Sequence, residues 1–249
     1  MNLYLDIETI PAQRLDVIAE IRDGLATRLA IDIANVKPPG NYKKQETIDA
    51  WTADEMPKAV RALSAQFDID ADAAYRKTGL DGAFGQVCVI GVAFDDEDPL
   101  TIWSPDYTDE AALLEDFGCL LVDRVRPADH FATLVIGHNV SAFDLRFLVQ
   151  RHIVNGYRPH AVIGKAAQAK PWESDKVFDT MTQWAGVGSR ISLDKLCRAL
   201  SVPSPKGEID GSKVWDFVKA GKISEVADYC ARDVEATRAV YKRLTFQAA

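Results

Sequence analysis

Short apolar runs with the spacing of strands recur along the chain, separated by polar residues that favour turns. Residues 86–94 (QVCVIGVAF) and 100–103 (LTIW) flank the acidic turn DDEDP, which predicts an antiparallel hairpin. The predicted strands cover residues 2–7, 86–94, 100–103, 132–136 and 177–180.

Longer stretches repeat their apolar residues every three or four positions, as one face of a helix does. The predicted helices cover residues 109–125, 141–154, 192–200, 212–219 and 223–244. The Gly-, Ala- and Lys-rich segment 156–172 predicts a loop. Strands at the start, followed by strands that alternate with helices, indicate an α/β fold with a mixed sheet flanked by helices.

The segment from about 11 to 84 differs in composition from the rest of the chain. Polar, Ala-rich stretches around 12–33 and 56–78 predict helices, and they flank a Pro-Pro-Gly break at 38–40. The 249 residues are enough for one sizeable α/β domain or for two small ones. We predict a single domain, 1–249, with a helical insertion at about 11–84.

Composition narrows the class of protein. A hydrophobic content of 47% is ordinary for a folded chain with a core. No apolar run approaches the roughly 18 residues that span a bilayer, and the N-terminus has the pattern of a strand rather than a secretory signal. The four cysteines form no C-x-x-C pair and each stands among apolar residues. We therefore expect reduced core cysteines, no zinc site, no membrane partner and a cytoplasmic location.

Charge is distributed unevenly along the chain. The formal net charge is −8, which by itself argues against a polyanionic partner. Residues 131–249 carry 17 Lys and Arg against 12 Asp and Glu, however, while residues 1–130 carry 12 against 25. A basic second half fits a surface that meets phosphate on one side only, and an uneven but solvated surface explains it equally well.

Three short segments carry candidate chemistry, and the first is D-I-E at 6–8. Residues two apart on a strand point to the same face, so Asp6 and Glu8 present two carboxylates side by side. Such a pair repels strongly unless cations bridge it. Alone, D-x-E is common and usually marks a solvated strand end.

The second segment is G-H-N-V-S-A-F-D at 137–144, which leads from a buried strand into a helix. Asp144 lies in the first turn of that helix, where the helix dipole alone favours an acid. Asn139 lies in the turn, where its amide can reach a substrate or hold the loop. His138 has no second His at ligand spacing, which favours a structural role.

The third segment is Y-C-A-R-D at 229–233, within the helix predicted at 223–244. Tyr229 and Asp233 stand at i and i+4, so they lie on one face of the helix. Taken alone, the pair is better explained by a hydrogen-bonded contact between helix residues.

In this order, the three segments resemble the three exonuclease motifs of the DEDD superfamily, in its tyrosine-bearing branch. Proofreading domains of family-B DNA polymerases carry these motifs. Residues 206–244 are similar to stand-alone predicted exonucleases related to that proofreading domain. The resemblance covers about 1–9 and 85–244, so the insertion inherits no role from it. It implies an RNase H-like fold: a five-stranded mixed sheet with its first three strands antiparallel, flanked by helices.

The resemblance also implies roles for the motif residues. Asp6 would bridge two divalent cations, Glu8 and Asp233 would hold the first, and Asp144 would hold the second. Hard carboxylate oxygens without thiolates favour Mg²⁺ or Mn²⁺. Two such ions, roughly 3.5–4 Å apart, would activate the attacking water and stabilise the leaving 3′ oxygen. Tyr229 would orient the water.

Substrate contacts follow less directly. By resemblance, Thr9 would contact the 3′-terminal nucleotide through its backbone. Phe143 would pack near the terminal bases or in the core, and a core role is favoured. Asp179 either supports the site or caps an ordinary turn. Phosphate contacts and solvated surface charge are equally good explanations for Arg190, Lys195, Arg198, Lys206 and Lys213.

The predicted function is a metal-dependent 3′→5′ exonuclease that acts on nucleic acid with a free 3′ end and releases nucleoside 5′-monophosphates. The likeness to polymerase domains favours single-stranded DNA over RNA. Nothing in the sequence indicates a requirement for the 2′-OH, so an exoribonuclease is the alternative within the same chemistry. A nucleic-acid-binding module or polymerase partner without turnover is a third possibility, against which the complete set of motif residues argues.

Overall fold

A five-stranded mixed sheet forms the centre of the computed structural model, which describes residues 1–247 except 171, 206 and 208. The strands are β1 (Asn2–Ile10), β2 (Gln86–Phe94), β3 (Leu100–Trp103), β4 (Leu134–Gly137) and β5 (Val177–Asp179). Their order is β3-β2-β1-β4-β5. The pairs β1–β2 and β2–β3 are antiparallel, while β1–β4 and β4–β5 are parallel. The predicted mixed sheet, with its first three strands antiparallel, is confirmed.

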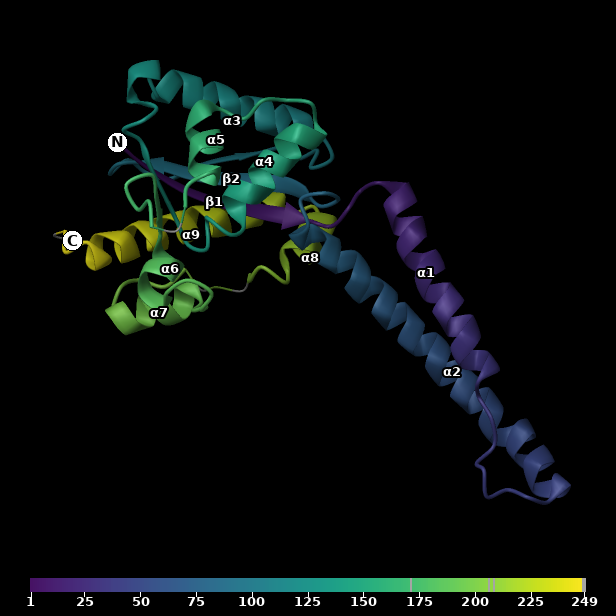
Figure 1. Ribbon diagram of the computed structural model, residues 1–249. Helices are drawn as coiled ribbons and strands as arrows, with labels where there is room; N and C mark the ends of the chain where they lie inside the picture. The colour runs from purple at the N-terminus through teal and green to yellow at the C-terminus, as the bar shows by residue number, and fades with distance from the viewer. Residues whose placement is uncertain (171, 206, 208, 248–249) are drawn as a thin grey trace.

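Helices cover both faces of this sheet. On one face lie α3 (Glu110–Arg124), α4 (Asp144–Val154) and α5 (Ala161–Ala167), and on the other lies α9 (Ile223–Leu244) (Figure 1). The helices α6 (Thr180–Ala185), α7 (Leu193–Leu200) and α8 (Val214–Lys219) pack beside α9. This is the α/β architecture of an RNase H-like fold.

Side chains alternate along β1, so neighbouring residues point to opposite faces of the sheet. Leu3, Leu5 and Ile7 are buried among apolar residues of α3, α4 and α5. Tyr4 points the other way and contacts Tyr241 of α9, with ring centroids 5.8 Å apart. Because side chains alternate along a strand, Asp6 belongs to the same face as Tyr4. The first candidate motif therefore faces α9.

A glycine allows α9 to come close to the sheet. Gly91 of β2 pairs with Asp6 across the antiparallel ladder. A Cβ at this position would lie 2.7 Å from Sγ of Cys230 and 3.0 Å from Cγ2 of Val234, closer than atoms normally approach. The absence of a side chain thus creates the space into which α9 packs directly above the first motif.

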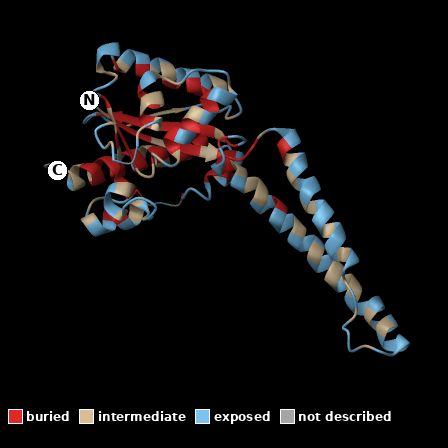
Figure 2. Ribbon diagram, in the orientation of Figure 1, coloured by how far each residue is buried: buried red, intermediate tan, exposed pale blue. Residues whose placement is uncertain are grey.

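The predicted insertion forms a helical arm. Helix α1 (Leu15–Ala34) runs outward and α2 (Gln45–Lys77) returns, followed by the short 3₁₀ helix η1 (Thr78–Leu80). Figures 1 and 2 show both helices projecting from the sheet domain with mostly exposed or half-buried surfaces. Within α1 and α2 only Val17 and Ala71 are buried, and both lie toward the base. The helical character of the insertion is confirmed.

The base of the arm is fastened beside the end of β1. The hydroxyl of Thr9 donates to the carbonyl of Gly79 at 2.7 Å, and the hydroxyl of Thr78 accepts from the amide of Ala12 at 2.8 Å. Arg76 of α2 donates two hydrogen bonds to the carboxylate of Asp216 on α8, at 2.7 and 3.1 Å. These contacts hold the emerging helices against the domain.

Several sequence-based expectations are corrected. Helix α2 begins at Gln45 rather than near 56, because the polar residues before Pro57 continue the helix without an obvious apolar period. The segment 156–172 is not all loop: it contains α5, which buries Val162, Ile163 and Ala166 against the sheet. Strand β4 spans 134–137 instead of 132–136.

The cysteines are reduced, as predicted, but one of the four does not lie in the core. All four are free, and Cys88, Cys197 and Cys230 are buried. Cys119 is exposed, because it lies on the side of α3 that turns away from the sheet. Among the described residues, no helix combines the length and apolar character needed to cross a membrane.

Candidate active site

Asp6 and Glu8 form the centre of the candidate site, on the face of β1 that meets α9. An oxygen of each carboxylate and Sγ of Cys230 all lie within 4.8 Å of one another. The register between β1 and β2 shifts between Glu8 and Thr9, which marks an irregularity at this point of the ladder. Such irregularities redirect side chains beside active sites. The predicted proximity of the two carboxylates is confirmed.

Helix α9 brings the third motif over this pair. The thiol of Cys230 donates to Oδ2 of Asp6 at 3.3 Å, a contact between residues 224 positions apart. Asp233, one turn further along, is only 8% exposed, and its Oδ1 has no hydrogen-bond partner among the described residues. The side chain of Tyr229 lies near the Asp233 carboxylate and lowers the pKa of that group. A buried carboxylate oxygen without a partner is costly unless something else satisfies it.

Asp144 reaches the cluster from the opposite direction. It is the first residue of α4 and is 3% exposed. Its Oδ1 accepts a hydrogen bond of 3.0 Å from the amide of Ile7, the residue between Asp6 and Glu8. Strand β4 pairs with β1 only as far as Tyr4, so it leaves this amide free for the side chain.

Burial disturbs the ionisation of all four carboxyl groups, and repulsion between carboxylates adds to it at Asp6, Glu8 and Asp144. Burial, followed by the charges of Asp233 and Asp144, holds the pKa values of Asp6 and Glu8 well above their usual range. Burial also raises the pKa of Asp144 to about 7 and that of Asp233 to about 6. Four carboxylates this close resist full ionisation at neutral pH unless positive charge enters the site.

The donor set therefore fits divalent cations. Asp6, Glu8, Asp144 and Asp233 supply hard oxygen ligands, which Mg²⁺ and Mn²⁺ prefer. The orphan Oδ1 of Asp233 is the kind of atom that a cation would satisfy. Cys230 is the nearby sulfur, and burial raises the pKa of its thiol well above the usual value, which keeps it protonated.

The predicted substrate-contact residues have separate roles. Thr9 uses its hydroxyl to hold the base of the arm. Phe143 packs against the core and its ring lies 5.4 Å from that of Phe147, as the favoured core role predicts. His138 contacts Thr180 Oγ1 and the Ile191 carbonyl, both at 2.9 Å, which confirms its structural role.

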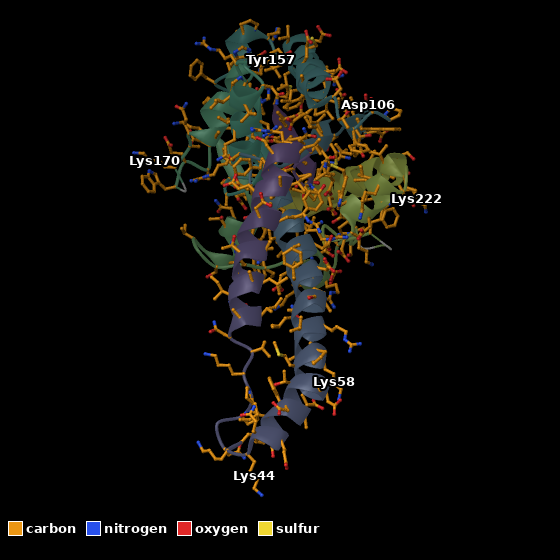
Figure 3. All side chains as sticks on the ribbon, turned by 90° about the vertical axis from the view of Figure 1, so that its right-hand side faces the viewer. Lys44, Lys58, Asp106, Tyr157, Lys170 and Lys222 are labelled. Atoms are coloured by element: carbon orange, nitrogen blue, oxygen red, sulfur yellow. The ribbon has the colours of Figure 1, made fainter. Side chains whose placement is uncertain are left out.

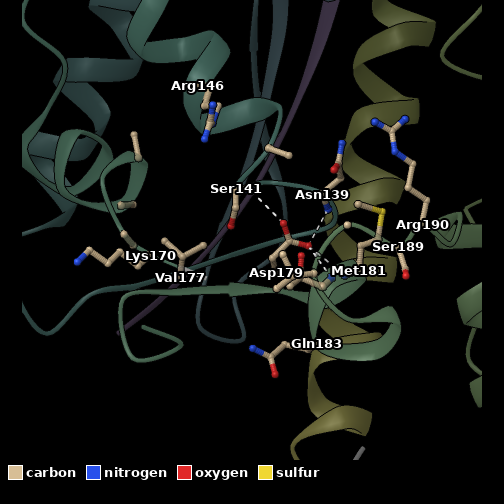
Figure 4. A pocket seen from close by; sticks show the side chains of 17 residues that line it. Asn139, Ser141, Arg146, Lys170, Val177, Asp179, Met181, Gln183, Ser189 and Arg190 are labelled. Atoms are coloured by element: carbon tan, nitrogen blue, oxygen red, sulfur yellow. Dashed lines mark hydrogen bonds between the residues drawn. The ribbon is translucent and has the colours of Figure 1, made fainter. Parts of the chain in front are cut away.

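Asp179 holds the second motif in place. Its carboxylate accepts hydrogen bonds from the amides of Asn139 and Ser141, both at 3.0 Å (Figure 4). It also caps α6 by accepting from the amides of Met181 and Thr182, at 3.0 and 3.2 Å. Asn139 itself adopts a left-handed backbone, φ 62°, which Asn tolerates better than most residues. Asp179 therefore caps α6 and also holds the turn that leads into Asp144.

The candidate phosphate contacts do not form one group. Arg190 lines a cleft beside Asn139. Arg198 pairs with Asp194 at 3.2 Å and Lys213 with Asp210 at 3.6 Å, while Lys195 is exposed. Lys206 lies outside the described residues.

One family comparison bears on this site. A family profile matches residues 80–249, more than half of the chain, and describes predicted 3′–5′ exonucleases related to the exonuclease domain of PolB. The chain belongs to this family. The match includes Asp144, Tyr229 and Asp233, but it begins after Asp6, Glu8 and the arm. A search of curated proteins found no match.

Three residues at or beside the site were not predicted from the sequence. Cys230 was treated as a core residue, although its position beside Tyr229 in the motif could have suggested contact with the carboxylates. Arg146 and Lys170 line the same cleft as Arg190, yet each stands alone in the sequence without a motif. Only packing brings them together.

Proposed function

We propose that the chain is a metal-dependent 3′→5′ exonuclease that releases nucleoside 5′-monophosphates. The observation that supports this most strongly is the buried carboxylate cluster. Its members have raised pKa values, and one buried oxygen of Asp233 has no hydrogen-bond partner among the described residues. A cluster of this kind is costly to fold without a function that requires it. Membership of a predicted exonuclease family supports phosphodiester hydrolysis as that function.

The four carboxylates share one task in this proposal. Asp6, Glu8, Asp144 and Asp233 would together hold the divalent cations. When bound, two Mg²⁺ or Mn²⁺ ions supply an activated water nucleophile and stabilise the leaving 3′ oxygen. Cys230 donates to Asp6 and so fixes the orientation of that carboxylate.

The proposed role of Tyr229 is to orient the attacking water without losing its own proton. Burial, followed by the charge of Asp233, raises the pKa of its hydroxyl well above the usual value, so the hydroxyl stays protonated at neutral pH. The hydroxyl lies near the Asp233 carboxylate, whose pKa it lowers. The lone pairs of the phenol oxygen remain free to accept from the attacking water, which orients that water toward phosphorus.

The substrate is nucleic acid with a free 3′ end, and the relation to the PolB exonuclease domain favours DNA over RNA. The test compares single strands of DNA and RNA of the same sequence, each labelled at the 5′ end. With Mg²⁺ or Mn²⁺ we expect a ladder that shortens from the 3′ end, with DNA degraded faster, and no products in EDTA. Faster degradation of RNA would favour the exoribonuclease alternative.

Asp6→Asn and the matched control Asp116→Asn assign the activity to the cluster. Both variants remove one carboxylate charge, but Asp116 is exposed on α3. Asp6→Asn should abolish turnover and Asp116→Asn should retain it. Full activity in EDTA, or in the Asp6 variant, would refute the proposed mechanism.

A further inference from the structure

A cleft of about 280 Å³ opens beside the candidate active site. Its walls come from four parts of the chain: the turn of the second motif with the start of α4, the end of α5 with the residues after it, β5 with the start of α6, and the segment 187–190. Figure 4 shows Asn139, Arg146, Lys170, Asp179 and Arg190 around it. The volume is near the lower end for ligand pockets, a size that suits one nucleotide unit.

The lining of this cleft is strongly positive. Arg146, Lys170 and Arg190 all belong to it, and none forms an ion pair with another described residue. Asp179 is the acidic residue of the lining, but it is 4% exposed and accepts four backbone hydrogen bonds. Amide donors compensate its charge, so the three cations dominate the potential in the cleft.

An exposed aromatic ring lies next to Lys170, one of the residues that line the cleft. The side chain of Trp172 is 76% exposed, an unusual state for a large apolar residue. The ammonium group of Lys170 lies 5.4 Å from the centroid of this ring, which places the ring next to a cleft-lining cation. Flat rings beside cations bind nucleic-acid strands by stacking on bases while the cations contact phosphates.

The cleft and the carboxylate cluster adjoin each other. Asn139 belongs to the turn that leads into Asp144, and the charge of Asp179 contributes to raising the pKa of Asp144. A strand whose 3′ end occupies the carboxylate cluster would therefore have its neighbouring nucleotide within reach of the cleft. All three cations also lie in the basic part of the sequence, 131–249.

We propose that this cleft binds the single strand next to the scissile phosphate, with Arg146, Lys170 and Arg190 contacting phosphates and Trp172 stacking on a base. A base inside a duplex has both faces covered by its neighbours, so a stacking ring favours single strands. The inference rests on the proposed function in assuming a nucleic-acid substrate. It adds the part of the surface that selects single strands.

The test measures binding in EDTA, so that it needs neither metal nor turnover. A fluorescently labelled single-stranded DNA oligonucleotide is titrated with the full chain, and anisotropy is followed over a range of salt. Lys170→Glu and Arg190→Glu should weaken binding, and each should flatten the plot of log affinity against log salt by about 0.7. Lys58→Glu is the matched control, since it makes the same charge change on the arm (Figure 3).

Trp172→Ala tests the stacking contact separately. Loss of one stacked base should weaken binding roughly 5- to 100-fold without changing the salt slope. Abasic sites placed one at a time near the 3′ end should weaken binding by the wild-type protein at one position, and Trp172→Ala should be insensitive at that position. The exposed positions of all three variants favour normal folding, which circular dichroism would check.

The outcomes separate this inference from the proposed function. If Lys58→Glu weakens binding as much as Lys170→Glu, or if a blunt duplex binds as tightly as the single strand, the cleft is not the binding surface and the inference is wrong. In that case nuclease activity can still be intact. Conversely, a chain that binds through the cleft but cleaves nothing with Mg²⁺ or Mn²⁺ would refute the proposed function alone.

Discussion

Replacing Asp144 by Asn should make the metal-free protein more stable while it abolishes activity. The substitution keeps the size of the side chain and an Oδ1 atom that accepts the hydrogen bond from the Ile7 amide. It removes the negative charge that the fold buries. The side chain is 3% exposed, and burial is the largest cause of the raised pKa.

The size of the effect follows from the pKa of Asp144. Its rise from 3.8 to about 7 in the folded state means that ionised Asp144 costs about 4 kcal/mol at pH 8, an upper estimate because its neighbours titrate with it. The side-chain amide of Asn would be buried with an unsatisfied N–H donor, which lowers the stability of the variant by about 1–3 kcal/mol. The net stabilisation of about 1–3 kcal/mol should raise Tm by roughly 2–10 °C in a chain of this length.

The sign of the effect depends on pH. Because the folded-state pKa of Asp144 is raised, the stability that its protonated form contributes is present at low pH and is lost as pH rises through about 7. The advantage of Asn over Asp should therefore shrink by about 2 kcal/mol between pH 7 and pH 5. Wild-type protein in EDTA should lose stability over the same rise in pH.

Thermal unfolding in EDTA at several pH values measures this, with Asp116→Asn as the exposed control. Adding Mg²⁺ or Mn²⁺ at pH 8 should stabilise the wild type by RT ln(1 + [M]/Kd) and the Asp144 variant by less. A variant that is less stable than wild type at pH 8, or a difference in Tm that does not change with pH, would refute the reasoning. So would full activity of the variant.

Three further predictions follow from the packing. Tyr229→Phe should fold normally and lose roughly 10- to 100-fold in cleavage rate, because it removes one hydrogen bond to a charged group; full activity would make the tyrosine a core residue. Gly91→Ala should lower Tm and the cleavage rate, because its Cβ would lie 2.7 Å from Sγ of Cys230; wild-type Tm and rate would contradict the close approach of α9. Replacing residues 24–64 by a short Gly-rich turn should leave single-strand cleavage and folding intact, since Val17 and Ala71 are retained; loss of the cooperative unfolding transition would show that the domain needs the arm.

Local geometry explains why much of the site could be predicted from the sequence. The period of a strand places Asp6 and Glu8 on one face, and the period of a helix places Tyr229 and Asp233 on one side of α9. Strand and helix patterns likewise indicated the sheet, its hairpin and the helical insertion. Such features depend on residues a few positions apart, so the order of residues alone determines them.

Contacts between distant residues were decided by the tertiary structure. The approach of Cys230 to Asp6 depends on the empty space at Gly91 on a third element. Arg146, Lys170 and Arg190 meet only because α4, the end of α5 and the segment 187–190 fold around one cleft. The exposure of Cys119 and the short helix within 156–172 also depend on which face packs against the sheet.

The sequence by itself determined the fold class, the helical nature of the insertion and which residues could form a carboxylate site. The tertiary structure decided how deeply that site is buried, which oxygen is left without a partner and where a positive cleft adjoins it. The physical reason is that desolvation and Coulomb interactions depend on distances through space. Those distances are set by packing between segments that the sequence keeps far apart.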